Sequence, residues 1–262
     1  MTNDVWLTKH PHLQPVADVH ARVEAAAAEI CARVAPVPDF SEYASDFHAG
    51  VPLLHSWKLS ANLLPPEAEV LTLIRTLASS SLPGTFAEQC RALEAEIDSI
   101  GARDELPLTH IGLFRYLGWA VLVRYLVPVV SAFDAWRNEE RWLRNYCPTC
   151  GEPPAMAQLT GKDPGRLRKL ACGRCKTRWR YRRTGCPFCQ VQDEHRLAVV
   201  AIDGDAGLRI DYCERCDGYL KTYDGEGNES VLLADWTSLH LDIIARDRGL
   251  KRMAASLYTL GA

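Results

Sequence analysis

Eight of the ten cysteines in this 262-residue chain fall into four Cys-x-x-Cys pairs within 70 residues. In such a turn two thiolates converge on one ion while backbone amides point at the sulfurs, and two turns complete a tetrahedron of ligands. The spacing therefore predicts two metal ions per chain, each held by four cysteines. The predicted ligands are Cys147, Cys150, Cys172, Cys175, Cys186, Cys189, Cys213 and Cys216.

The cysteine-rich half is an internal repeat of two copies. Each copy opens with Cys-Pro-x-Cys and closes with Cys-x-Arg-Cys, with 21 residues between the two pairs in the first copy and 23 in the second. Only ten residues separate the copies. The repeat favours self-contained units, in which the first four cysteines bind one ion and the last four bind the other. The rival arrangement is an interleaved cross-brace, in which the first pair joins the third.

The metal is not fixed by the cysteine pattern, because four thiolates suit zinc and also mononuclear iron. The sequence Cys-Pro-Thr-Cys-Gly at 147–151 is typical of both rubredoxins and zinc ribbons. Gly151 lets an amide approach a sulfur without a Cβ clash, whereas Lys176, Gln190 and Asp217 follow the other pairs. Four thiolates leave no open position for a substrate water, which argues against hydrolysis by the metal ion. A purely structural role of both ions is the main alternative to a functional one.

The composition changes abruptly at Tyr146-Cys147. Before it, apolar residues recur at three- and four-residue steps over 16–34, and further helices are expected over 66–77, over 85–101 and from Thr109. The last is apolar on all sides, with a kink expected at Pro128, and such a helix usually forms the centre of a bundle. We therefore expect a multi-domain α+β protein with an N-terminal all-α helical bundle, two tandem rubredoxin-like or zinc-ribbon modules and a C-terminal helix. The expected divisions are 1–145, 146–184, 185–224 and 225–262.

The bulk properties point to a cytoplasmic protein. The net charge is −3 and the pI is about 6.2, so the whole molecule has no strong attraction to nucleic acid or anionic lipid. The segment Met1–Trp6 has no signal-peptide pattern. The most apolar stretch, 117–133, contains Arg124 and Pro128, so we expect a buried helix and no membrane insertion. Thiols stay reduced in the cytosol, which favours metal ligands over disulfides.

Residues 162–183 carry ten basic side chains and one acidic one, Asp163. As a strand, this stretch would place Trp179 and Tyr181 on one face and three arginines on the other. The pattern indicates that the aromatic rings pack over the metal module and that the arginines form a solvated basic face. The alternatives are a docking surface for an acidic partner and a nucleic-acid surface.

No catalytic constellation emerges from the sequence, so we expect no enzyme activity. Phosphate-binding and nucleophile motifs are missing, and the eight histidines form no metal-protease pattern. His195 is expected on the surface rather than beside a metal. Cys31 and Cys90 are expected on helices as small buried hydrophobic residues.

The cysteine motifs and their flanks resemble the formate dehydrogenase accessory protein family FdhE. Three flanking segments carry the resemblance besides the four pairs: Thr177-Arg178-Trp179, Gly218-Tyr219-Leu220-Lys221, and the stretch Ala234–Asp242 that fits D-x-x-S-L-x-L-D. The resemblance is specific over about residues 146–245 and only architectural before that.

The resemblance implies a cytoplasmic, non-enzymatic, chaperone-like factor for the maturation of formate dehydrogenase. It implies a helical domain followed by two rubredoxin-like modules, binding to the catalytic subunit, and iron at the eight cysteines. A homo-oligomer is left open, and nucleic acid is disfavoured as a partner. Two alternatives remain: a rubredoxin-type electron carrier with two Fe(Cys)4 sites, and a zinc-ribbon regulator that binds nucleic acid through residues 162–183.

Overall fold

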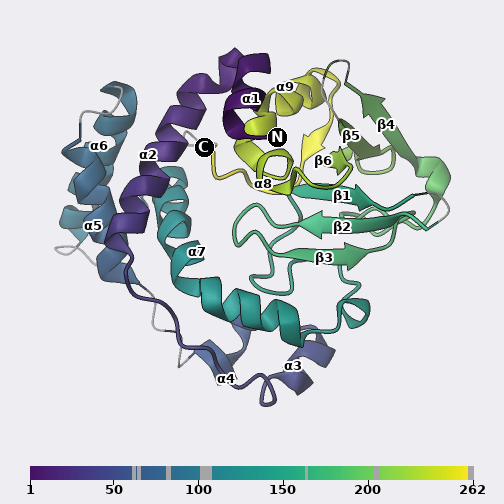
Figure 1. The fold of residues 1–262 in the computed structure, drawn as a ribbon, viewed down its shortest axis with the longest axis horizontal. Coiled ribbons are helices and arrows are strands. Elements are labelled where there is room, and N and C mark those ends of the chain that lie inside the picture. The colour runs from purple at the N-terminus through teal and green to yellow at the C-terminus, as the bar shows by residue number, and fades with distance from the viewer. Residues whose placement is uncertain are drawn as a thin grey trace. The chain divides into compact units, whose positions relative to one another are not determined.

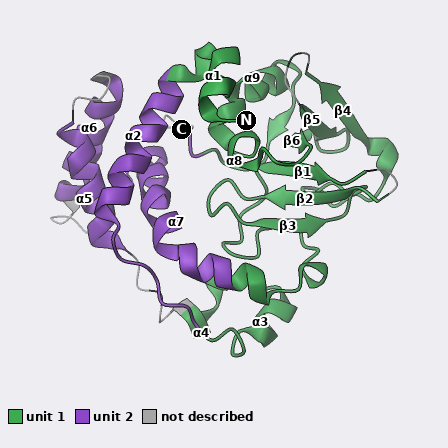
Figure 2. Ribbon diagram, in the orientation of Figure 1, with its two compact units in different colours: residues 1–14, 39–61, 133–256 green, residues 15–38, 62–132, 257–262 purple. Residues whose placement is uncertain are grey.

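The computed structural model describes residues 1–60, 63, 66–80, 84–100, 108–162, 165–202, 204 and 207–258. The chain divides into two compact units (Figure 2). Unit 1 contains residues 1–14, 39–61 and 133–256, and unit 2 contains residues 15–38, 62–132 and 257–262.

Unit 2 is built on four long helices. They are α2 (Gln14–Ile30), α5 (Glu67–Ala78), α6 (Gly84–Ile100) and α7 (Ile111–Trp136), of which α2 starts and α7 ends in unit 1. Each places a stripe of apolar side chains in one shared core, with Val23, Leu73, Leu93 and Leu117 fully buried. The predicted helices are found, but the first ends at Ile30 and not at Val34, and the expected end of the third at Gly101 lies outside the described residues. Pro128 lies inside α7 without ending it.

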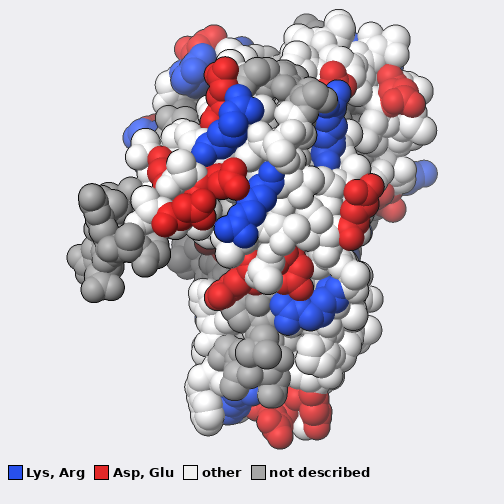
Figure 3. Space-filling model, turned by 90° about the vertical axis from the view of Figure 1, so that its left-hand side faces the viewer, with Lys and Arg blue, Asp and Glu red and all other residues white. Residues whose placement is uncertain are grey.

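The outer surface carries charges of both signs. On the face drawn in Figure 3, Lys and Arg side chains lie beside Asp and Glu side chains. Within unit 2, Arg75 lies 3.4 Å from Asp98, and Arg124 lies 3.1 Å from Glu24. The Arg75–Asp98 pair is exposed, and a pair of this kind contributes little stability.

Among the described residues, α7 is the one helix whose length and composition would allow it to cross a membrane. Of its apolar 18-residue stretch, 44% is buried inside the protein. Leu113, Leu117 and Val121 of α7 are fully buried in the unit 2 core. A core helix therefore accounts for the apolar stretch.

Unit 1 holds the sheet and several short helices. The helical segments are α1 (Asn3–Lys9), η1 (Pro11–Leu13), α3 (Ala44–Ala49), η2 (Leu53–His55), α4 (Trp57–Ser60), η3 (Glu139–Arg141), η4 (Glu194–Arg196), α8 (Glu229–Leu232), η5 (Asp235–Ser238) and α9 (Leu239–Asp247). The strands are β1 (Met156–Thr160), β2 (Leu167–Ala171), β3 (Arg178–Tyr181), β4 (Leu197–Ala201), β5 (Leu208–Cys213), β6 (Gly218–Asp224) and β7 (Lys251–Arg252).

The sheet repeats one topology twice (Figure 1). In each copy a cysteine pair precedes an antiparallel hairpin, and a second pair joins the hairpin to an antiparallel third strand: β1-β2-β3 in the first copy and β4-β5-β6 in the second. The two copies are joined by parallel pairing of β1 with β6, with Met156 opposite Lys221. The strand order is β3-β2-β1-β6-β5-β4, and β7 also pairs with β6.

The units do not follow the predicted domain limits in a simple way. Residues 1–14 and 39–61, placed by the sequence in the helical domain, group with the sheet. The expected C-terminal helical segment contains α9 but also the short strand β7. The fold is a mixture of helices and a sheet, and the division at 145, 184 and 224 remains a prediction.

Candidate metal centres

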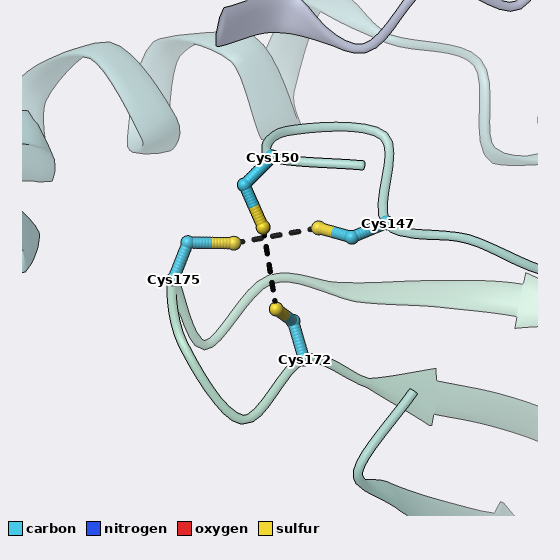
Figure 4. Close-up of side chains that lie close together, drawn as sticks. All are labelled: Cys147, Cys150, Cys172 and Cys175. Atoms are coloured by element: carbon cyan, nitrogen blue, oxygen red, sulfur yellow. Dashed lines mark hydrogen bonds between the residues drawn. The ribbon is translucent and has the colours of Figure 1, made fainter. Parts of the chain in front are cut away.

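The first four cysteines come together in one buried cluster (Figure 4). The Sγ atoms of Cys147 and Cys175 lie 3.3 Å apart, and those of Cys150 and Cys172 lie 3.4 Å apart. All four sulfurs lie within 4.8 Å of one another. A tetrahedron with metal–sulfur bonds of about 2.3 Å has edges of about 3.8 Å, so the cluster has the dimensions of a four-thiolate site.

The last four cysteines form the second cluster. Its Sγ–Sγ distances are 3.8 Å between Cys186 and Cys216 and 3.7 Å between Cys189 and Cys213. Cys189 and Cys216 are only half-buried, so this cluster is closer to solvent than the first. Both clusters therefore join cysteines within one copy of the repeat, as the linear pairing predicts, and both could hold a metal ion.

Each Cys-x-x-Cys turn, called a knuckle below, is followed by a residue in the left-handed backbone region. Gly151 has a φ of +77°, and the residues that follow the other three pairs have similar values: Lys176 (+61°), Gln190 (+58°) and Asp217 (+58°). Lys176, Gln190 and Asp217 are the three non-glycine residues with positive φ in the described part of the chain. This conformation costs a non-glycine residue roughly 1–2 kcal/mol, so the fold holds three knuckles in a strained turn that turns backbone amides toward the sulfurs.

Hydrogen bonds from the turns support the sulfurs. The amide of Arg174 donates to Sγ of Cys172, and the amide of Phe188 donates to Sγ of Cys186, each at 3.4 Å. In the first cluster Oγ1 of Thr177 lies 3.3 Å from Sγ of Cys175. The two amides of Arg174 and Phe188 therefore place donors beside sulfurs that would carry negative charge as metal-bound thiolates.

The first knuckle is also held by the distant segment 52–55. The amides of Leu53 and Leu54 donate to the carbonyl oxygens of Pro148 and Thr149 at 2.8 and 2.9 Å. A Cβ at Gly151 would approach His55 Cε1 to 2.9 Å. Residues far from the cysteine repeat in sequence therefore form one wall of this site.

The second cluster requires a close approach at Gly218. A Cβ at this position would approach Phe188 Cδ2 to 2.8 Å and Cys216 Sγ to 3.2 Å. A glycine two residues after the last pair is therefore required by packing, because strand β6 starts directly against the third Cys-x-x-Cys turn, Cys186–Cys189.

Burial opposes ionisation of these thiols when they are considered alone. It raises the pKa of Cys147 well above its ordinary value and raises the pKa of Cys186 to about 12. A bound cation reverses that balance, because a coordinating thiol loses its proton outright. The chemistry of the donor set is thus that of a soft or borderline cation with a filled coordination shell.

The Thr177-Arg178-Trp179 segment, which leads into strand β3, makes structural contacts with each of its three side chains. Trp179 and Tyr181 are buried, as the alternation predicts, and Trp179 Nε1 donates to the carbonyl oxygen of Arg144 at 2.9 Å. Arg178 donates to Gln158 Oε1 at 3.0 Å. Thr177 Oγ1 lies 2.8 Å from Thr149 Oγ1, which links the two knuckles of the first cluster.

Much of the basic stretch 162–183 is paired within the chain. Arg166 pairs with Asp224, Lys169 with Glu139, Arg174 with Glu152 and Arg180 with Glu140. Arg168 is 5% exposed and donates to the carbonyl oxygen of Gly185 at 3.0 Å. These four pairs neutralise part of the positive charge that a nucleic-acid surface would use. Asp163 lies outside the described residues.

The other family-like segments form a buried ionic cluster. Nζ of Lys221 lies 2.6 Å from Asp235 Oδ1 and 2.9 Å from Asp242 Oδ2. Arg252 donates to both carboxylate oxygens of Asp235 at 2.8 and 2.9 Å, and Tyr219 donates to Asp242 at 2.7 Å. Strand β6 is thereby tied to η5, α9 and β7, so these motif residues serve structure.

The remaining sequence predictions have mixed outcomes. Cys90 lies buried on α6, and burial raises its pKa to about 12. Cys31 follows the end of α2 and is half-buried, so its predicted place on a helix is wrong by one residue. His195 is exposed in η4, as expected. A third cluster was missed: His10, His12 and His240. The one sequence signal for this cluster is the His-x-His spacing of His10 and His12.

Comparison with known proteins agrees with this geometry. A family model described as "FdhE, central domain" matches residues 146–183, which contain the first cluster and strands β1–β3. A protein FdhE homolog of Aquifex aeolicus is 34% identical over 134 residues, which cover 49% of this chain and 47% of that protein. The chain is similar to FdhE proteins.

Two further relatives extend the likeness of this chain to FdhE proteins. A protein FdhE homolog of Stutzerimonas stutzeri is 29% identical over 220 residues, which cover 80% of the chain and 66% of that protein. These matches span about half to two thirds of the relatives' length. The crystal structure of the FdhE protein from Pseudomonas aeruginosa has a TM-score of 0.54 and 23% identity, covering 98% of this chain and 96% of that one. At this identity the structural match speaks for the fold.

Proposed function

We propose that this chain is a non-enzymatic, chaperone-like accessory factor that supports the maturation of formate dehydrogenase in the cytoplasm. The observation that carries the proposal is the FdhE central-domain match at 146–183, which coincides with the first cluster of four cysteines. In this proposal the chain binds the catalytic subunit of formate dehydrogenase. It acts by binding and not by turnover.

The eight clustered cysteines are proposed as ligands of two metal ions. Thiolates that fill a tetrahedral shell leave no position for a substrate water, which suits a structural or electron-storing ion better than a hydrolytic one. The family resemblance favours iron over zinc. In the proposal the ions hold the two modules in shape, because each copy of the repeat is too small to fold on an apolar core alone.

Complementation tests this proposal. The gene is deleted in its own organism, and formate dehydrogenase activity is measured after return of the wild type, Cys147→Ser/Cys150→Ser or Cys31→Ser. The proposal expects activity to be lost in the deletion, restored by the wild type and by Cys31→Ser, and not restored by the double variant. Full activity in the deletion strain would exclude the accessory role.

The exposure of the second cluster favours one alternative, an electron carrier. Electron exchange needs a site near the surface, and Cys189 and Cys216 are half-buried. This alternative expects a red protein, as isolated without air, that is reduced and reoxidised reversibly. A colourless protein with zinc alone at both clusters would exclude it.

A further inference from the structure

Three histidines from distant parts of the chain meet in unit 1. His10 follows α1, His12 lies in η1, and His240 is the second residue of α9. One imidazole nitrogen from each lies within 4.8 Å of the others. The cluster is separate from both cysteine sites in its residues, and neither the family match nor the cysteine repeat includes it.

The rings are held in a definite arrangement. His10 and His240 stack with their centroids 5.0 Å apart and their planes at 24°, while His12 stands nearly perpendicular to both, at 5.8 Å from His10 and 5.6 Å from His240. Two parallel rings and one crossed ring can direct their nitrogens to a common point.

The backbone around His10 is fixed by local structure. Its amide donates to the carbonyl oxygens of Trp6 and Leu7 at 3.0 and 3.2 Å, and its own carbonyl accepts from the amide of Leu13. The Trp6 ring stacks on His10 at 4.0 Å, and Trp6 Nε1 donates to the carbonyl oxygen of Thr237 at 3.0 Å. Trp6 thus connects the segment that carries His10 to the segment just before His240.

The chemistry of three imidazoles differs from that of the thiolate clusters. Neutral imidazole suits zinc, cobalt, nickel and copper, with metal–nitrogen bonds of about 2.0–2.1 Å. A tetrahedral ion of that size needs nitrogens about 3.3 Å apart, and His12, whose side chain is exposed, has room to rotate inward. Three protein ligands leave the fourth position open, in contrast to the filled shell of a four-cysteine site.

We propose that His10, His12 and His240 bind a third metal ion, a divalent borderline transition cation, with an open coordination position. The ion joins the N-terminal segment to α9 across 228 residues of sequence. An ion that binds the folded chain and not the unfolded chain raises the free energy of unfolding, and this stabilisation grows with the logarithm of the free ion concentration above Kd.

Cobalt(II) tests this site, because its spectrum distinguishes nitrogen from sulfur ligands. The full chain without an affinity tag is prepared anaerobically with two equivalents of Zn²⁺, enough to fill the two tighter-binding four-cysteine clusters only, then mixed with a small excess of Co²⁺ and passed through a desalting column. Zinc and cobalt are then counted per chain. The proposal expects two zinc ions and one cobalt ion, with visible d–d bands and without the near-ultraviolet thiolate-to-cobalt band.

Two variants complete the test. His12→Ala, at an exposed position, should retain two zinc ions and lose the cobalt and the rise in Tm that cobalt causes. His195→Ala, at an exposed histidine outside the cluster, should match the wild type. The proposal is overturned if the wild type retains no cobalt, if the cobalt shows thiolate bands, or if His12→Ala binds cobalt as the wild type does.

Discussion

Nζ of Lys221 lies 2.6 Å from Oδ1 of Asp235, and both side chains are buried, with exposed fractions of 1% and 7%. The lysine is on β6 and the aspartate in η5, so this pair fastens the segment after the sheet to the strand that joins the two copies of the repeat. A buried charge without its partner is strongly destabilising.

Asp235→Ala should lower the free energy of unfolding by about 3–5 kcal/mol, because it leaves both Lys221 and Arg252 without this carboxylate. Denaturant unfolding measured by circular dichroism gives the value. Asp247→Ala is the matched control, since its pair with Arg246 is 69–77% exposed, and it should cause no measurable change. Equal stabilities of Asp235→Ala and Asp247→Ala would contradict this role.

The Lys221–Asp235 pair also makes the free energy of unfolding depend on pH. Although burial opposes the charge, Lys221 and Arg252 hold the pKa of Asp235 below its ordinary value of 3.8. A carboxyl whose pKa is lower in the folded state stabilises the fold above its unfolded pKa, and this contribution is lost as the pH falls below that value. The difference in unfolding free energy between the wild type and Asp235→Asn should therefore be constant from pH 7 to about pH 5 and shrink below about pH 4. A difference that stays constant down to pH 3 would speak against it.

The left-handed residues of the knuckles predict unequal responses to adding and removing a side chain. Gly151→Ala should lower the free energy of unfolding by about 1–3 kcal/mol, because of its positive φ and the contact with His55. Gln190→Gly should leave the free energy of unfolding nearly unchanged, because the relief of backbone strain and the added entropy of the unfolded chain are each worth about 1 kcal/mol. Thermal unfolding of metal-loaded protein separates them, and a larger loss for Gln190→Gly than for Gly151→Ala would refute this account of the turns.

Self-contained clusters predict that one ion is lost at a time. Cys147→Ser/Cys150→Ser should lower the metal content by one ion per chain, because the second cluster takes its ligands from the other copy. Metal analysis of anaerobically purified protein counts the ions. Cys31→Ser, outside both clusters, should have the metal content of the wild type. Loss of both ions in the double variant would indicate that the sites depend on each other.

The sequence predicts features that are encoded locally. Each cysteine pair and its turn lie within five residues, so the spacing alone indicates the knuckles and the linear pairing found in the clusters. The buried Trp179 follows from the alternation along β3. The helices over 14–30 and 111–136 follow from periodicity and apolar length.

The remaining features depend on contacts between distant residues, for which a single sequence carries little signal. The parallel pairing of β1 with β6 uses backbone groups that any side chain could accompany. The amides of Leu53 and Leu54 bind the first knuckle from nearly a hundred residues away. The two segments that contain Lys221 and Asp235 were recognised in the sequence, but the contact between these residues could not be predicted without the fold.

Anaerobic affinity capture from the native cell, followed by mass spectrometry, tests the proposed function most directly. The account predicts that the wild type and Cys31→Ser capture the catalytic subunit of formate dehydrogenase, and that Cys147→Ser/Cys150→Ser does not. Capture of nucleic-acid-binding complexes by the metal-loaded wild type, without that subunit, would contradict it.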